Sequence, residues 1–104
     1  MPIYVMLTKV SPDATKNPFD LVELEKEVKA SIKRNCPDVK WIKNLAVFGP
    51  YDYLDIFEAP NDEEASKVAI IVRSFGHATT ETWSAIEWDN FKDTIAHIRK
   101  APIE

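Results

Sequence analysis

Four side chains in this sequence are candidates for proton transfer, namely His77, Asp55, Tyr51 and Asp52. All four belong to residue types that serve as general acids or bases in enzymes. Asp55 is the most unusual, because it stands two positions after Tyr53 and two before another aromatic residue in a strand-like segment. A carboxylate in such a place must find a partner or shift its pKa upward. These residues form the candidate catalytic set.

A ligand-binding site would need only a cavity with a few polar groups. Its expected lining is Tyr53, Asp55, Thr80 and Thr82. The threonines are better explained by their preference for β-strands than by ligand binding. The two histidines and the single cysteine are widely scattered and show no metal-ligand spacing, so we expect neither a metal nor a cofactor.

Each candidate catalytic residue also has a structural alternative. Asp55 can pair with Lys40, Lys43 or a hydroxyl at the rim of a sheet, since structural pairs also perturb carboxylates. His77 lies in a short loop, where a lone histidine is more often a surface residue. Asp52, beside a turn, can bind the backbone of its own hairpin. The sequence leaves open whether these residues react or hold the fold.

The elements that position these residues follow from the spacing of apolar side chains. Residues 2–10, 39–48, 52–59 and 77–88 are rich in β-formers and predict four strands. A short helix is expected over residues 89–100. Two longer helices are predicted by apolar stripes at helical spacing, which are Leu21, Leu24, Val28 and Ile32 in the first and Ala65, Val68, Ala69, Val72 and Phe75 in the second.

The helix ends carry capping signals. Asn17 and Asn61 are suited to start the two longer helices, because a short polar side chain can accept from the first free amide groups. Asn35 is expected to end the first helix in the left-handed conformation, and Gly76 to end the second. Asp89 is the expected cap of the last helix.

The order of elements is β-α-β-β-α-β followed by a helix. Two α-linked halves around a central hairpin predict the ferredoxin-like α+β sandwich, in one domain spanning residues 1–104. Its four-stranded antiparallel sheet is expected to carry both longer helices on one side, as right-handed crossovers require.

Both faces of the predicted strands are apolar, although a sheet covered on one side should alternate apolar with polar residues. A bare apolar face of this size exceeds what monomers usually expose. We therefore expect a homodimer, sheet facing sheet, with Tyr53 and Asp55 in the shared interior. A C-terminal helix of about 12 residues spans only about 18 Å and covers less. Association through exposed strand edges would give a larger ring.

Several short motifs together resemble the GYD-domain family. They are Gly49-Pro50-Tyr51-Asp52, then residues 58–62 ("EAPND"), then Gly76 followed by residues 80–85 ("TETWSA"). The resemblance implies a small ferredoxin-like domain of the dimeric α/β-barrel kind. It lends no catalytic residues, and only the signature positions Gly49, Tyr51 and Asp52 carry over.

The composition of the chain limits the classes of partner that it is expected to bind. The net charge is −4 with acids and bases interleaved, so long-range attraction to nucleic acid or to an anionic membrane is not expected. The longest apolar run, residues 68–72, is far shorter than the roughly 20 residues that span a bilayer. A lone Cys36 and the absence of a signal-peptide pattern before the first strand predict a cytoplasmic protein.

The resulting expectation is a homo-oligomeric domain that binds a small metabolite or a protein partner at the sheet–sheet interior. The alternative is a cofactor-free enzyme of the dimeric α/β-barrel type, an oxygenase, isomerase or decarboxylase. That alternative rests on analogy of fold, and a fold does not imply a function.

Overall fold

The computed structural model describes residues 1–15 and 17–98 of the chain. The predicted elements occur in the predicted order, with a short 3-10 helix (Pro12–Thr15) after the first strand. Their bounds are β1 Ile3–Val10, α1 Pro18–Asn35, β2 Lys40–Ala46, β3 Tyr53–Glu58, α2 Asp62–Ser74, β4 Ala78–Ala85 and α3 Trp88–Ala96. The last helix ends earlier than expected, and the end of its predicted range, residues 99 and 100, lies outside the described residues.

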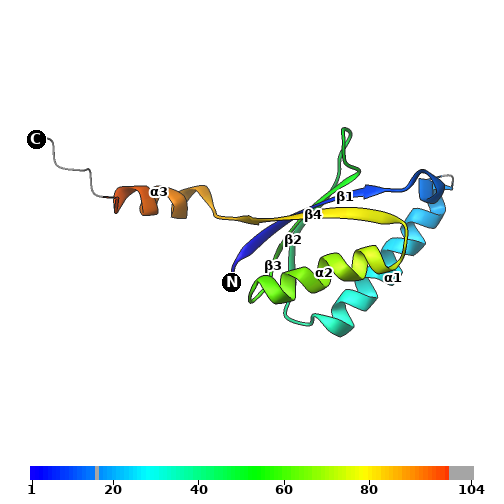
Figure 1. Cartoon of the computed structure of the whole chain (residues 1–104), viewed down its shortest axis with the longest axis horizontal. Coiled ribbons are helices and arrows are strands. Elements are labelled where there is room, and N and C mark those ends of the chain that lie inside the picture. The colour runs from blue at the N-terminus through cyan, green and yellow to red at the C-terminus, as the bar shows by residue number, and fades with distance from the viewer. Residues whose placement is uncertain (16, 99–104) are drawn as a thin grey trace, which may run out of the picture.

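The four strands form one sheet in the order β2-β3-β1-β4, with every neighbouring pair antiparallel. Helices α1 and α2 both lie on one face of this sheet (Figure 1). This arrangement confirms the ferredoxin-like α+β fold. Helix α3 leaves the sheet at the end of β4 and extends away from the rest of the chain (Figure 1).

The caps of the two longer helices form as predicted. Asn17 Oδ1 accepts from the amide of Phe19 at 3.1 Å, and Asn61 Oδ1 accepts from the amide of Glu64 at 2.9 Å. Gly76 follows α2 with a φ of 80°, the left-handed conformation that favours glycine. Among the described residues it is the only one with a positive φ.

Two expected helix ends are wrong. Asn35 is the last residue of α1 and does not turn left-handed; the helix ends instead at Cys36, whose amide donates to the Ile32 carbonyl at 2.7 Å. Asp89 lies inside the first turn of α3, and Glu87 occupies the N-cap without a side-chain bond. Asp89 instead forms an exposed ion pair with Lys92 one turn further along the helix, at 3.1 Å.

The core fills the space between the sheet and the two longer helices. Phe57 lies at its centre, with its ring 5.6 Å from that of Tyr4 and 5.5 Å from that of Trp41. Ala65, Val68 and Ala69 of α2 are buried against this cluster. Cys36 is buried there as well, and burial raises the pKa of its thiol. Large rings fill the core where the α2 side chains are small.

The register shows which strand residues face the helices. In β1 and β3, Tyr4 pairs with Phe57, Met6 with Asp55 and Thr8 with Tyr53. Met6 and Phe57 are core residues, so Asp55 and Tyr53 lie on the helix-covered face. The prediction that Tyr53 and Asp55 line a sheet–sheet interior is therefore wrong. The alternation of side chains along a strand shows which residues share a face of the sheet, but it does not show which face the helices cover.

We call the other side of the sheet, away from the helices, the open face. Its apolar side chains form rows across neighbouring strands, such as Leu45–Leu54–Leu7 and Ile56–Val5–Trp83. The charged residues of this face are Lys9, Lys40, Lys43, Glu58 and Glu81. The prediction of an apolar second face is confirmed by these rows.

Candidate functional site

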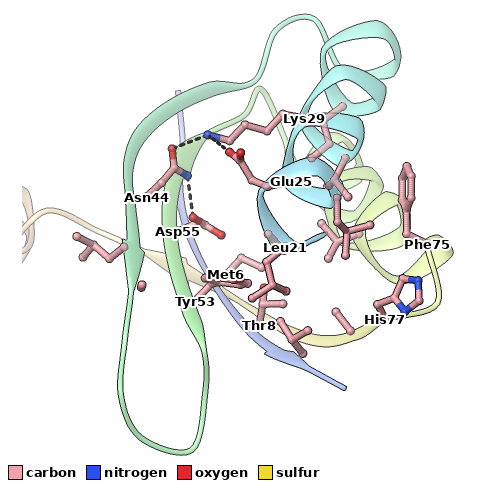
Figure 2. A pocket seen from close by; sticks show the side chains of 18 of the residues that line it. Met6, Thr8, Leu21, Glu25, Lys29, Asn44, Tyr53, Asp55, Phe75 and His77 are labelled. Carbon is pink, nitrogen blue, oxygen red and sulfur yellow. Dashed lines mark hydrogen bonds and ion pairs between the residues drawn. The ribbon is translucent and has the colours of Figure 1, made fainter. Parts of the chain in front are cut away.

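A cavity of about 280 Å³ opens between α1 and the helix-covered face of the sheet, and we call it the α1 pocket. Helix α1 forms one wall, strands β1, β2 and β3 form the other, and the turn from α2 into β4 closes one end (Figure 2). Most of its lining is apolar, supplied by Met6, Val10, Leu21, Leu24, Val28, Ile32, Trp41, Val72 and Phe75. The predicted apolar stripe of α1 thus does face the sheet, but only Ile32 is fully buried.

Polar side chains are gathered at one end of the α1 pocket (Figure 2). Asn44 of β2 donates through Nδ2 to the Asp55 carboxylate at 2.7 Å. Lys29 Nζ donates to the Asn44 carbonyl oxygen at 3.1 Å and pairs with Glu25 at 3.1 Å. The four residues form one chain of contacts from helix to sheet. Its formal charge is −1, because Asp55 and Glu25 are acidic and Lys29 is the one base.

Asp55 is thus held by an amide rather than by the predicted partners Lys40, Lys43 or a hydroxyl. Burial raises the pKa of the Asp55 carboxyl, and the Asn44 hydrogen bond and the Lys29 charge partly offset that rise. Burial also raises the pKa of the Tyr53 phenol, assisted by the nearby carboxylates of Asp52 and Asp55. A half-buried carboxylate beside an apolar cavity favours any ligand that brings it a positive charge or a hydrogen-bond donor.

His77 also lines the α1 pocket, from the turn between α2 and β4. Its side chain is exposed, and it lies at the opposite end of the pocket from Asp55 (Figure 2). The two strongest candidates for proton transfer therefore share a cavity without meeting each other.

Tyr51 and Asp52 lie outside the α1 pocket and tie the β2–β3 hairpin to the rest of the sheet. The Tyr51 hydroxyl donates to the Glu81 carboxylate of β4. Asp52 Oδ2 accepts from the Val10 amide at 2.7 Å, and the Asp52 amide donates to the Thr8 carbonyl at 2.8 Å. The carboxylate thus binds the end of β1, so the expectation that it binds its own hairpin backbone is wrong.

Thr80 and Thr82 are on the helix-covered face of β4 but do not line the α1 pocket. Thr82 lines a second, smaller hollow near Tyr4 and Asp62, whose hydroxyl and carboxylate are 2.6 Å apart. The Thr82 hydroxyl is buried without a hydrogen-bond partner among the described residues. Of the predicted ligand residues, the structure brings together Tyr53 and Asp55 and leaves the two threonines elsewhere.

Glu25, Lys29 and Asn44 were not predicted as site residues. The sequence did carry a signal for the first two, because Glu25 and Lys29 are four residues apart and follow Leu21 at the same interval. The Asn44 position depends on an irregularity of β2 between Trp41 and Lys43, which shifts the pairing register. No periodicity reveals such a shift.

The fold and the pocket together define a ferredoxin-like α+β domain with a ligand-sized cavity under one helix. Residues 4–95 match the sequence model of the GYD domain, and the chain belongs to that family. The likeness thus extends over nearly all the described elements, from β1 to α3.

Two further comparisons agree with this assignment. A protein of Thermus thermophilus named "Glutamine synthetase and cystathionine beta-lyase binding protein" is 28% identical over 99 residues, which cover 95% of this chain and 100% of that protein. The crystal structure of FFRP-DM1 is similar in fold with a TM-score of 0.57 and 18% identity, covering 83% of this chain and 100% of that one. Within the part of the chain that the structure describes, every helix is too short or too polar to cross a membrane.

Proposed function

We propose that this chain is a homodimeric binding protein whose α1 pocket takes a small amphipathic amine. The observation that carries the proposal is a carboxylate, Asp55, at one end of an otherwise apolar cavity. Ligand sites are typically apolar concavities with a few polar groups that fix orientation. The polar end has a net negative charge, so a protonated amine is the complementary group.

The cavity volume limits the size of the ligand. A water-sized group takes up about 30 Å³, so 280 Å³ holds about nine such groups. Phenethylamine has about this number of non-hydrogen atoms, and it joins an aromatic ring to a primary amine. Its ring would lie against Met6, Leu24 and Val28, with the ammonium beside Asp55.

The proposal is tested by titrating the protein with phenethylamine, 2-phenylethanol and phenylacetate and following amide shifts by NMR. We expect the amine to bind more tightly than the alcohol, and phenylacetate to bind least. Asp55→Asn should remove the preference for the amine, because the neutral amide lacks the charge that an ammonium pairs with. Glu23→Gln, which removes an exposed carboxylate of the same helix that bears Glu25, is the matched control and should leave it intact.

Two results would contradict the proposal. Equal affinity for the amine and the alcohol would refute the amine as ligand class. Absence of binding by all three compounds at millimolar concentration would refute the pocket as a ligand site.

The geometry gives less support to the catalytic alternative. Proton transfer to a substrate requires groups within hydrogen-bond reach of the reacting atoms. Asp55 and His77 line opposite ends of the pocket, while Tyr51 and Asp52 are engaged in holding the sheet. We therefore propose no reaction for this chain.

Self-association is part of the proposal because the open face is apolar. Its rows, Leu45–Leu54–Leu7 and Ile56–Val5–Trp83, lie side by side, and Trp83 is 53% exposed. Burial of such a surface is favourable at about 25 cal/mol per Å². The open face contains three lysines and two glutamates, so two copies related by a twofold axis can place unlike charges together.

A second candidate function is binding to a metabolic enzyme in the cytoplasm. The T. thermophilus relative is named for binding two enzymes, glutamine synthetase and cystathionine β-lyase. In this chain, Phe48 at the tip of the β2–β3 hairpin is fully exposed, at 100%, and contributes nothing to the core. Exposed aromatic residues frequently anchor protein–protein interfaces.

This second function is tested by calorimetric titration of the chain against purified glutamine synthetase and cystathionine β-lyase of the same organism. We expect Phe48→Ser to abolish binding without changing the fold. The control Phe19→Ser, at another strongly exposed phenylalanine (80%), should bind normally. Absence of heat with both enzymes would refute this candidate while leaving the pocket proposal untouched.

A further inference from the structure

Helix α3 is not packed against the rest of the described chain. Among the described residues, no other helix or strand packs along it, and it extends from the end of β4 away from the sheet (Figure 1). The described chain has a radius of gyration of 17.2 Å, against about 13 Å for a compact domain of this length. Its longest dimension is 65 Å and its shortest 18 Å.

Helix α3 exposes several large apolar side chains to solvent. Four large apolar residues follow one another at helical spacing, and we call them the α3 stripe: Trp88, Phe91 and Ile95 within α3, and Ile98 just beyond its end. Their exposures are 64%, 41%, 47% and 67%. An isolated helix of nine residues is not stable in water, because nucleation costs more than so few hydrogen bonds return. The stripe therefore requires a surface to cover it.

The segment between β4 and α3 directs the helix away from its own sheet. It consists of Ile86 and Glu87, and Glu87 is extended with φ −59° and ψ 141°. Folding α3 back onto its own open face would require a reversal within these two residues, neither of which is a glycine or a proline.

A dimer of open faces alone would have a small interface. The four strands are six to eight residues long. At about 3.3 Å per residue and about 4.8 Å between strands, a sheet of four such strands has a face of roughly 19 by 23 Å. Two such faces bury roughly 900 Å², which is less than the roughly 1,200 Å² at which stable interfaces begin. The apolar area of two α3 stripes is available to make up the difference.

We infer that α3 is an exchanged arm, which packs its apolar stripe against the margin of the open face of a second copy of this chain. The inference rests on the homodimer of the proposed function and adds the element that completes it. In a twofold dimer each chain gives one arm and receives one, so both stripes are covered by the same contact. The apolar side chains nearest the margin are Leu45 on edge strand β2 and Trp83 on edge strand β4.

The test is an isotope-filtered NMR experiment on the full chain, in dimers mixed from labelled and unlabelled copies. We expect contacts between Phe91 or Ile95 of one copy and open-face side chains of the other, such as Leu45, Leu54 or Trp83. Contacts of α3 only with its own sheet would overturn the inference, even if the mass is twice the 11.9 kDa of one chain. A single-chain mass at all concentrations would overturn both the arm and the homodimer.

Two variants separate the stripe from the rest of α3. Phe91→Glu places a charge within the stripe and should weaken dimerisation by at least about tenfold, as loss of a central aromatic contact does. Asn90→Glu adds the same charge to α3 outside the stripe and should leave dimerisation unchanged. Neither residue contributes to the buried core, so circular dichroism should show both variants folded. Equal dimerisation of the two variants would contradict the arm.

Discussion

Asp52 and Asp55 are three positions apart, but their carboxylates have different roles in the structure. Asp52 accepts from the Val10 amide and so closes the ladder where β1 ends, which is a structural task. Asp55 faces a cavity, receives one hydrogen bond from Asn44, and has a pKa raised by burial. A carboxylate that the fold holds at a cost, with room beside it for a ligand, is typical of a binding site.

The first prediction concerns the pH dependence of stability. The folded pKa of Asp55 lies above its unfolded value, so the folded chain holds the proton more tightly. Stability should therefore fall as pH rises from the ordinary carboxyl pKa of 3.8 through the raised folded value, and the loss should persist at pH 7. Asp55→Asn, whose oxygen still accepts from Asn44, should be more stable than the parent at pH 7.

Urea unfolding of the parent and of Asp55→Asn across pH 3 to 7 measures this effect. The two free energies of unfolding should converge at the acidic end, where Asp55 is protonated in both states. Glu23→Gln, at an exposed site, should parallel the parent throughout. A variant less stable than the parent at neutral pH would show that the Asp55 charge stabilises the fold, which contradicts the role given to it here.

The sequence was informative about Asp55 as a residue but not about its surroundings. Its position among aromatic residues in a strand marked it as unusual, and that judgement holds in the structure. The face on which it lies, and its contacts with Asn44 and Lys29, depend on helix packing and on the register shift in β2. These are long-range properties, which local spacing does not encode.

At the scale of the elements, the two glycines of the chain differ in what they contribute. Gly76 ends α2 with a φ of 80°, whereas Gly49 in the β2–β3 turn has no positive φ. A Cβ at either position would meet no atom within 4 Å, so no neighbouring atom obstructs an added methyl group at either glycine. Any difference between them must come from the backbone conformation itself.

The second prediction uses the two glycines as a matched pair. Gly76→Ala should destabilise the chain by about 1 kcal/mol, because alanine is strained in the left-handed region. Gly49→Ala should be neutral or stabilising by up to about 1 kcal/mol, through a smaller unfolded-state entropy. Thermal unfolding resolves such a difference, since 1 kcal/mol shifts Tm by about 4–8 °C in a domain of this size. Equal Tm values for the two variants would contradict the assignment of the α2 terminus.

The elements themselves were largely predictable from local signals. Asn17, Asn61 and Gly76 mark helix boundaries through capping chemistry that acts within a few residues, and all three occur as predicted. Asn35 and Asp89 carry the same kind of signal and were misjudged. Cys36 and Glu87 take those positions because the tertiary fold sets where each helix stops, and it overrides a weak local preference.

At the scale of the whole molecule, the described chain leaves two apolar surfaces uncovered. One apolar surface covers the open side of the sheet, and another runs along α3, against which no other described helix or strand is packed (Figure 1). The helix-covered side, by contrast, has a regular core and a small internal pocket. In the functions proposed above, self-association uses the open side of the sheet and ligand binding uses the helix-covered side.

The third prediction concerns the folding equilibrium of the proposed dimer. If folding and association are coupled, Tm should rise with chain concentration, because mass action favours the associated state. Trp83→Glu on the open face should lower Tm and remove its dependence on concentration. Ile70→Glu on α2 is the control, since Ile70 is exposed to a similar degree, 56% against 53%, on the other side of the molecule. Concentration-independent Tm for the parent would argue that the chain folds as a monomer.

The burial of Cys36 has a practical consequence for all of these experiments. The side chain is 1% exposed, and a thiol with a raised pKa is slow to react, because the thiolate is the nucleophile. It is also the only cysteine in the chain. A cysteine introduced at Phe48 or Asn90 would thus be the sole site available to a maleimide dye or nitroxide, and probes of the hairpin tip or of the C-terminal helix can be attached without first altering the native sulfur.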